Sequence, residues 1–156
     1  MIEIEIPGFR TFRFQDLVLD VNGTLAKDGE LIEGVAGLLK ELRAKLNLHL
    51  ITADTHGKQA EVDRILGMKA AAIPHKDQAQ AKLRYIEQLG ADEVVAIGNG
   101  ANDAAMLARA ALGIVIIGPE GAAVEAVLKA DAVAPDIRTG LEMLLYPKRL
   151  IATLRR

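Results

Sequence analysis

The chain has 156 residues, 51% of them hydrophobic, and this size and composition predict one domain, residues 1–156, with a single substantial core. Its 19 basic and 21 acidic residues give a formal net charge of -2, so charge indicates neither nucleic acid nor an anionic membrane surface as a partner. There is no cysteine, which excludes a disulfide framework and a thiolate metal site.

The N-terminal segment, residues 1–5, lacks the basic and then apolar pattern of a signal peptide. No apolar run in the chain approaches the roughly 18 to 20 residues that a membrane helix needs. We therefore expect a cytoplasmic protein with no membrane partner.

The first predicted element is an antiparallel hairpin. Isoleucine alternates with charged residues at Ile2, Ile4 and Ile6, and Thr11–Phe14 alternate in the same way. Pro7-Gly8 lies between the two segments and favours a turn.

Short apolar runs without alternation follow, and such runs are typical of strands buried on both faces of a parallel sheet. Segments with helical spacing lie between them. The predicted strands are 17–21, 48–52, 70–73, 94–98 and 114–117, and the predicted helices lie around 35–46, 60–66, 81–89, 102–110, 121–129 and 139–154. Alternating strands and helices predict an α/β fold, a three-layer, doubly wound (Rossmann-like) parallel sheet. Gly67, Gly90 and Gly113 fall where these helices are expected to end.

Polar residues gather where three of the predicted strands end. The first strand runs into Asp20-Val21-Asn22-Gly23-Thr24, the second into Thr52-Ala53-Asp54, and the fourth into residues 98–103, Gly-Asn-Gly-Ala-Asn-Asp. A turn or a helix cap explains any one of them alone. In a doubly wound sheet ligands bind at the carboxyl ends of the strands, so the three together predict a site.

These residues resemble the haloacid dehalogenase superfamily, whose first motif is Asp-x-Asp-Gly-Thr after a buried strand. The family's strand-end Thr, helix-borne Lys and Gly-Asp-Gly-x-Asn-Asp find counterparts in Thr52, Lys82 and residues 98–103. The resemblance covers about residues 16–134. Within the superfamily the chain is most similar to the phosphorylation domain of P-type ATPases, in the form called soluble P-type ATPase.

The resemblance implies that Asp20 is a nucleophile that takes a phosphoryl group as an aspartyl-phosphate. It also implies that Gly23, Thr52 and the Ala53 N–H bind the phosphoryl oxygens, and that Lys82 neutralises the charge on the phosphoryl group and on Asp20. The spacing from Lys82 to Asn99 is similar to that in P-type ATPases. Lys76 lies farther from Asn99 and fits the longer spacing of small phosphatases in the superfamily. We predict Lys82, with Lys76 as the alternative.

A magnesium ion is the implied cofactor. By resemblance, Mg²⁺ would be held by Asp20, the carbonyl of Asn22, Asn99 and, through water, Asp103, which are oxygen ligands of the kind that this ion prefers. Asn99 stands where the family usually has an Asp. Its amide oxygen can still bind the cation but brings no charge, so we expect a lower metal affinity.

Asn22 replaces the second Asp of the first motif, which in the family protonates the leaving oxygen and then activates water. General acid–base catalysis contributes roughly 10²- to 10⁴-fold, so the predicted function is a slow Mg²⁺-dependent phosphohydrolase that favours activated phosphates. The alternative is a catalytically weakened phosphate- or nucleotide-binding or regulatory protein on the same scaffold. A dinucleotide-binding protein is a weaker option, because the chain has no Gly-x-Gly-x-x-Gly motif after a strand.

Too few residues separate Leu25 from Thr52 to hold a cap domain, and only a small hairpin at 27–30 fits. An uncapped, open site predicts a small phosphorylated substrate or an exposed phosphoryl group as the partner, with a homo-oligomer possible. His49, His56 and His75 show no metal-ligand spacing. The basic tail, 146–156, is predicted to be a helix docked on the core, with a subunit contact as the alternative.

Overall fold

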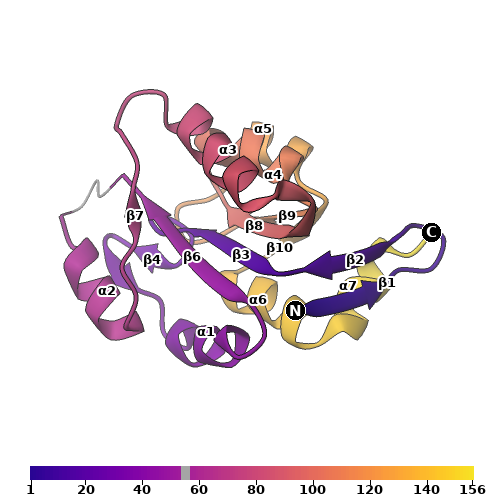
Figure 1. The fold of residues 1–156 in the computed structure, drawn as a ribbon. Helices are drawn as coiled ribbons and strands as arrows, with labels where there is room; N and C mark the ends of the chain where they lie inside the picture. The colour runs from indigo at the N-terminus through magenta and orange to yellow at the C-terminus, as the bar shows by residue number, and fades with distance from the viewer. Residues whose placement is uncertain (54–56) are drawn as a thin grey trace.

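The computed structural model of the protein describes residues 1–53 and 57–156 (Figure 1). A six-stranded sheet runs through the molecule, and all of its neighbouring strands are parallel. In spatial order its strands are β10 (Ala132–Ala134), β9 (Leu112–Ile116), β8 (Val94–Gly98), β3 (Asp16–Asp20), β6 (Asn47–Thr52) and β7 (Ala71–Ala72). Helices lie on both of its faces (Figure 1), so the predicted doubly wound α/β fold is confirmed.

The five predicted strands agree with the observed ones to within two residues at each end, and the sixth, β10, was not predicted. It comprises only Ala132-Val133-Ala134, which is too short to form a recognisable pattern, and it forms by pairing with β9. Tertiary pairing therefore decides this strand, since two of its three residues are alanines, which have little preference for β structure.

The helices form two layers. On one face of the sheet lie α3 (Gln78–Leu89), α4 (Ala104–Arg109) and α5 (Val124–Lys129); on the other lie α1 (Val35–Arg43) and α6 (Ile137–Leu145) (Figure 1). Each face has a hydrophobic cluster of its own.

The central strand β3 supplies side chains to both clusters. Leu17 and Leu19 belong to the cluster on the α1 and α6 face, and Val18 belongs to the cluster beneath α3 and α4. All three are fully buried, because successive side chains of a strand point to opposite faces. Burial on both faces explains why the run shows no alternation. The packing on both faces also holds the polar end of the strand in place.

Two of the three predicted cap glycines end helices. Gly67 follows α2 (Gln59–Leu66) with φ 60°, and Gly90 follows α3 with φ 90°, both in the left-handed region that favours glycine. The prediction for Gly113 was wrong, since this residue lies inside β9. A Cβ at Gly113 would overlap the carbonyl oxygen of Leu107 in α4, so glycine lets the helix pack closely on the strand.

The helix predicted around 139–154 is two helices, α6 and α7 (Pro147–Leu154). Tyr146 separates them with φ −118° and ψ 78°, outside the helical region. A proline disfavours helical backbone in the preceding residue, and it is itself well suited to the first position of a helix. Pro147 therefore ends one helix and begins the next.

The predicted N-terminal hairpin is confirmed as β1 (Ile2–Glu5) paired antiparallel with β2 (Thr11–Phe14). Its apolar side chains extend the core, and the rings of Phe12 and Phe14 stack with centroids 5.2 Å apart. A 3₁₀ turn, η1 (Ala91–Glu93), precedes β8, and the backbone N–H of Gln15 donates to Glu93 O there.

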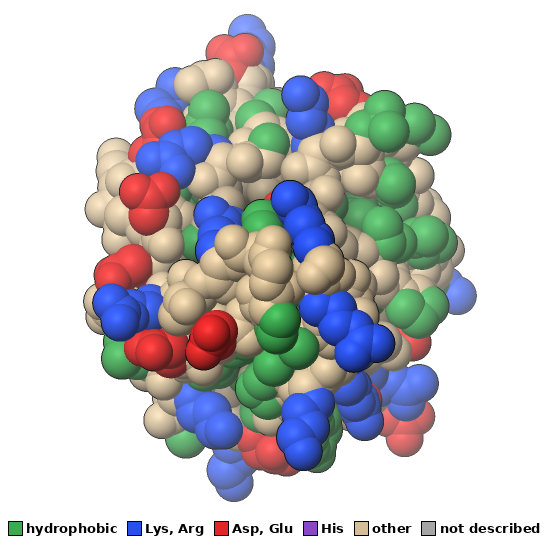
Figure 2. Space-filling view, turned by 90° about the vertical axis from the view of Figure 1, so that its right-hand side faces the viewer, with side chains coloured by type: hydrophobic (Ala, Val, Ile, Leu, Met, Phe, Trp, Pro, Cys, Tyr) green, Lys and Arg blue, Asp and Glu red, His purple; other side chains and the backbone are tan. Residues whose placement is uncertain are grey.

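The C-terminal helix α7 docks on this end of the molecule. Leu150 is buried, and the backbone N–H of Arg156 donates to Pro7 O in the hairpin turn at 3.1 Å. Figure 2 shows Lys and Arg side chains spread over this face among acidic, apolar and uncharged groups. In the described ranges, no helix combines the length and apolarity needed to cross a bilayer.

Between β3 and α1 the chain forms the small hairpin that was expected, β4 (Ala26–Lys27) with β5 (Glu30–Leu31). Its turn residues Asp28 and Gly29 have φ values of 51° and 80°, as a two-residue hairpin turn requires. Residues 1–53 and 57–156 include no inserted cap domain.

Candidate active site

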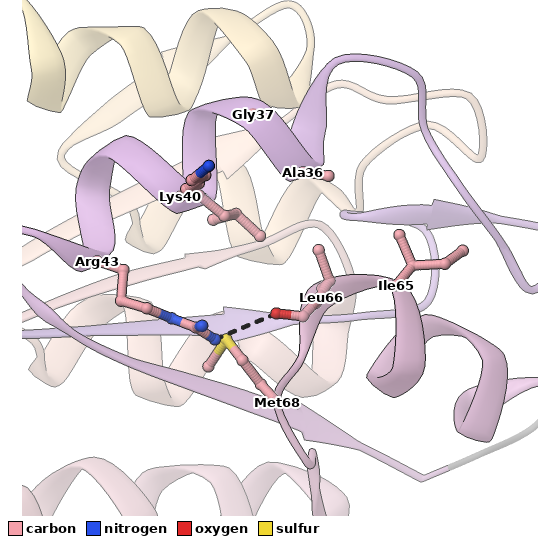
Figure 3. A pocket seen from close by; sticks show the side chains of 8 residues that line it. Ala36, Gly37, Lys40, Arg43, Ile65, Leu66 and Met68 are labelled. Carbon is pink, nitrogen blue, oxygen red and sulfur yellow. Dashed lines mark hydrogen bonds between the residues drawn. The ribbon is translucent and has the colours of Figure 1, made fainter.

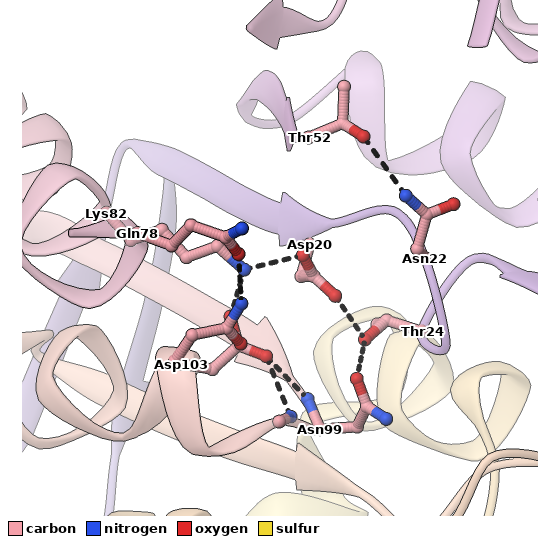
Figure 4. A network of polar contacts seen from close by, with 10 residues as sticks. Asp20, Asn22, Thr24, Thr52, Gln78, Lys82, Asn99 and Asp103 are labelled. Atoms are coloured by element: carbon pink, nitrogen blue, oxygen red, sulfur yellow. Dashed lines mark hydrogen bonds and ion pairs between the residues drawn. The ribbon is translucent and has the colours of Figure 1, made fainter. Parts of the chain in front are cut away.

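Three neighbouring strands deliver polar side chains to one edge of the sheet. Asp20 is the last residue of β3, Thr52 is the last residue of β6, and Asn99 follows β8. Because β3 pairs in parallel with both β6 and β8, these ends lie side by side (Figure 4). A cavity of about 110 Å³ opens between them, lined by Asp20, Asn22, Ala53, Gln78, Lys82, Asn99 and Asn102.

An ammonium group between two carboxylates forms the centre of the site. Lys82 Nζ in α3 donates to Asp20 Oδ1 at 2.7 Å and to Asp103 Oδ1 at 2.6 Å (Figure 4). All three residues are at most 6% exposed. A carboxylate buried this deeply is costly unless it is paired, so Lys82 is the cation that offsets negative charge on these two acids.

Burial and the neighbouring charges shift the pKa values of Asp20 and Lys82. The pKa of Asp20 is raised to about 7, chiefly by burial and then by the Asp103 carboxylate, although Lys82 and the Thr24 hydroxyl act in the opposite direction. Burial lowers the pKa of Lys82, but the two carboxylates outweigh burial, so this pKa is raised. Lys82 therefore keeps its charge while Asp20 titrates near neutral pH.

Asp103 is held by the backbone as well as by Lys82. It ends the 3₁₀ turn η2 (Ala101–Asp103), and its Oδ2 accepts from the N–H groups of Asn99 and Gly100, each at 2.9 Å. A Cβ at Gly98 would overlap the Asp103 carboxyl group, which explains the glycine. Both oxygens of Asp103 thus have protein partners, and the residue orients Lys82 and the loop after β8.

The loop after β3 supplies the other polar atoms. Thr24, fully buried, has its hydroxyl oxygen 3.3 Å from Asp20 Oδ2 and 3.3 Å from Asn99 Oδ1, and it donates its one proton to either acceptor. The Asn22 amide Nδ2 donates to Thr52 Oγ1 at 3.3 Å. Asp20 Oδ2 and Asn99 Oδ1 therefore face each other across the Thr24 hydroxyl.

These oxygens are the atoms that a hard cation would use. Asp20 Oδ2 and Asn99 Oδ1 are of the right chemistry for Mg²⁺, and backbone carbonyls and water commonly complete such a set. In the part of the chain that the structure describes, no three His, Cys, Asp or Glu side chains are grouped to hold a metal. The fit to Mg²⁺ thus rests on one carboxylate and one amide at this point.

The structure brings together the residues that sequence reasoning proposed, and it separates the two candidate lysines. Lys82 contacts Asp20, whereas Lys76 is exposed in the loop before α3. Three further residues of the site were not singled out: Thr24, Gln78 and Asn102. Thr24 and Asn102 lie inside the recognised motifs, and Gln78, which accepts from Asn102 Nδ2 at 2.6 Å, lies one helical turn before Lys82.

A family model of haloacid dehalogenase-like hydrolases matches residues 5–111, more than half of the chain. The chain belongs to this family. The predicted superfamily and the predicted class of enzyme, a hydrolase, are therefore confirmed. The family match does not test the more specific similarity to soluble P-type ATPases, which stays a prediction.

One relative in sequence is the uncharacterised protein MJ0073 of Methanocaldococcus jannaschii, which is 40% identical over 92 residues, 56% of this chain and 99% of that protein. The 3-deoxy-D-manno-octulosonate 8-phosphate phosphatase of Moraxella catarrhalis, solved with magnesium, phosphate and its sugar, has a TM-score of 0.65 at 21% identity, over 91% of this chain and 94% of that one. A phosphoserine phosphatase, solved as a phospho-aspartyl intermediate analogue, has a TM-score of 0.67 at 17% identity, over 86% and 99%. At sequence identities this low, the similarity to the two solved structures shows a common fold alone.

The protein also has larger pockets, which lie away from Asp20. Figure 3 shows one of about 370 Å³ between α1 and α2, lined by Ala36, Gly37, Leu39, Lys40, Arg43, Ile65, Leu66 and Met68. The Arg43 guanidinium donates to Leu66 O at 3.2 Å, which caps the end of α2. None of its lining residues belongs to the Asp20 cavity.

Neither of the described histidines, His49 and His75, lines the Asp20 cavity. His49 Nε2 lies 2.8 Å from Asp16 Oδ1, and its Nδ1 lies 3.2 Å from the Tyr85 hydroxyl, so this ring joins β3, β6 and α3. His75 is exposed. Asp54 and His56, which entered the sequence predictions, lie outside the described residues.

Proposed function

We propose that the chain is a Mg²⁺-dependent phosphohydrolase in which Asp20 is the nucleophile. One observation carries the proposal: the Asp20 carboxylate faces a small cavity with one oxygen on the Lys82 ammonium and the other beside the Thr24 hydroxyl. The phospho-aspartyl analogue of the phosphoserine phosphatase, and the magnesium and phosphate in the octulosonate phosphatase, support the same chemistry.

The reaction has two displacement steps. An oxygen of Asp20 attacks phosphorus, the bond from phosphorus to the leaving oxygen breaks, and the leaving group takes a proton from solvent. Water then attacks the phosphoryl group and releases a proton to solvent, the bond between phosphorus and Asp20 breaks, and phosphate departs while the carboxylate is restored. Lys82 stabilises the negative charge in both steps because it already lies 2.7 Å from Asp20.

Other residues would bind the phosphoryl oxygens. In the proposed complex the Thr52 hydroxyl and the Ala53 N–H donate to them, since Thr52 ends β6 and Ala53, the next residue, lines the cavity. Gly23 has φ 78°, so the loop after β3 can turn its backbone toward the phosphoryl group without a side chain in the way. The open edge suits a small phosphorylated substrate or a phosphoryl group exposed on a larger one, and a second subunit could cover it in a homo-oligomer.

Magnesium is the proposed cofactor. Asp20, the carbonyl of Asn22 and Asn99 would hold the ion, with Asp103 contributing through water because both of its own oxygens have protein partners. When bound, Mg²⁺ supplies charge that offsets the phosphoryl oxygens and orients them for displacement.

Turnover is proposed to be slow for ordinary alkyl phosphates. The Asn22 amide donates to Thr52 Oγ1 and can neither protonate a leaving oxygen nor deprotonate water. Acyl, aryl and pyrophosphate esters have leaving groups that need no protonation, so they are the favoured substrates. The same observation favours a second candidate function, a phosphate- or nucleotide-binding regulatory protein without turnover.

Turnover of p-nitrophenyl phosphate and acetyl phosphate, with and without Mg²⁺, tests the proposal in the native chain beside Asp20→Asn. We expect metal-dependent hydrolysis that the substitution abolishes. Absence of turnover in both proteins would refute the phosphohydrolase and favour the binding protein.

A further inference from the structure

A tight turn after β9, the strand next to β8, lies against the proposed cation site. Residues 118–121 follow β9, and the Gly121 N–H donates to Gly118 O at 2.9 Å. One hydrogen bond joins this turn to Asn99, since Asn99 Nδ2 donates to Gly121 O at 3.1 Å. A second bond follows directly after the turn, where the Ala123 N–H donates to Asn99 O at 2.9 Å. The turn and the loop after β8 are thus held as one unit.

The turn also touches the loop after β3. A Cβ at Gly118 would lie 3.1 Å from Gly23 O, so the two backbones are in close approach. Residues 118–121 therefore contact both of the loops that carry the proposed cation ligands.

This packing brings the Glu120 carboxylate beside Asn99. A Cβ at Gly23 would overlap Glu120 Oε2 and would lie 2.8 Å from Asn99 Nδ2 and 3.0 Å from Asn99 Oδ1. The carboxylate and the amide therefore border the same small space, which is kept open because residue 23 has no side chain. Asn99 Oδ1 is the oxygen that faces Asp20 across Thr24 (Figure 4).

The charge around this space is short of what a divalent cation requires. Lys82 offsets one of the two buried carboxylates, and Asp103 has both oxygens engaged, so Asp20 alone presents an anionic oxygen there. Asn99 contributes a neutral amide oxygen. Among residues 1–53 and 57–156, no Lys, Arg or His forms an ion pair with Glu120, so its carboxylate is available.

We propose that Glu120 supplies a further carboxylate to the cation site, acting on Mg²⁺ beside Asp20 and Asn99 directly or through a bound water. The inference rests on the proposed function. Glu120 is exposed and its side chain is flexible, so it approaches Asn99 from the solvent side and can adjust when the ion binds. It restores in this chain the negative charge that an amide at position 99 lacks.

Magnesium affinity of the substrate-free protein, measured by isothermal titration calorimetry, tests the role of Glu120. We expect Glu120→Gln to weaken Mg²⁺ binding by about 10- to 100-fold. The matched control is Glu125→Gln, which replaces an exposed glutamate in α5, the helix after the turn. This substitution should leave the affinity unchanged. Asn99→Asp added to Glu120→Gln should bring the affinity back to the wild-type range, because it returns a carboxylate to the same space.

The outcomes separate the two proposals. If native protein hydrolyses p-nitrophenyl phosphate only with Mg²⁺ and Glu120→Gln binds the ion as tightly as Glu125→Gln does, Glu120 is not a ligand and the phosphohydrolase stands. If Glu120→Gln weakens binding but Asn99→Asp does not restore it, the effect is on folding of the turn and the inference fails. A native chain that neither binds Mg²⁺ nor turns over substrate overturns both.

Discussion

At the scale of single residues, the site combines a lysine shared by two buried carboxylates with an incomplete set of proton-transfer groups. Lys82 joins Asp20 to Asp103, and the backbone N–H groups after β8 satisfy the remaining Asp103 oxygen. Asn22, by contrast, presents an amide where a titratable group would be needed. Two substitutions probe these two properties separately.

Replacing Asn22 tests proton transfer. Asn22→Asp should raise the Mg²⁺-dependent kcat for an alkyl phosphate by roughly 10²- to 10⁴-fold, because a carboxyl group can protonate the leaving oxygen and then activate water. The gain should be much smaller for acetyl phosphate, whose leaving group needs no proton. The control is Asp20→Asn in the same background, which should remain inactive. A kcat that does not rise would show that other parts of the site are unable to support hydrolysis.

Replacing Lys82 tests the charge pairing. Lys82→Met leaves Asp20 and Asp103 buried without a cation and should lower the free energy of unfolding by about 3 to 5 kcal/mol, measured by urea denaturation. It should also abolish turnover. Lys76→Met is the matched control, since Lys76 is exposed and should change neither quantity. Loss of activity in the Lys76 variant with retention in the Lys82 variant would reverse the assignment of the site lysine.

At the scale of elements, the close approach of β9 and α4 holds the loop after β8 against the sheet. Gly113 in β9 leaves no room for a side chain beside the carbonyl of Leu107. The helix begins directly after Asp103, so its position on the strand also positions the carboxylate that orients Lys82. Packing far from the cavity therefore contributes to the geometry of the site.

Gly113→Ala tests this packing. The added methyl group meets backbone, which cannot rotate away, so we expect a loss of about 1 to 3 kcal/mol in the free energy of unfolding. Gly37→Ala in the exposed interior of α1 provides the opposite control, because its Cβ would meet nothing within 4 Å. That substitution should stabilise the protein by roughly 0.5 to 1 kcal/mol, as alanine favours helix. Equal effects of the two substitutions in urea denaturation would contradict the close contact.

At the scale of the whole molecule, the buried acid at the sheet edge links stability to pH. The pKa of Asp20 is raised to about 7 in the folded protein, mainly by burial, from an ordinary value of 3.8. The folded state therefore holds this proton more tightly than the unfolded chain does. The resulting stabilisation is complete below the ordinary pKa and is lost as pH rises through about 7.

Comparing unfolding at two pH values measures this linkage. Between roughly pH 5 and pH 8 the metal-free native protein should lose more unfolding free energy than Asp20→Asn, which has no carboxyl to ionise at that position. Mg²⁺ should offset part of the loss at the higher pH, because it binds the ionised form and so favours the folded state. Identical pH dependence in the two proteins would show that Asp20 titrates in its ordinary range.

The sequence by itself was sufficient for the broad fold, the family and the residues at the ends of the strands. Strands buried on both faces leave continuous apolar runs, and the hairpin leaves alternation, since both patterns follow from local chain geometry. The positions of Asp20, Thr52 and Asn99 could be predicted because parallel strands end at one edge of the sheet.

Only the tertiary structure decided the features that depend on distant segments. β10 is too short to form a pattern and exists by pairing with β9, and Gly113 is required by the helix that packs on its strand. The contact between Lys82 and Asp20 likewise joins residues that lie far apart in the sequence. Glu120 lies in the turn 118–121, and only the hydrogen bonds between this part of the chain and the loop after β8 bring its carboxylate beside Asn99.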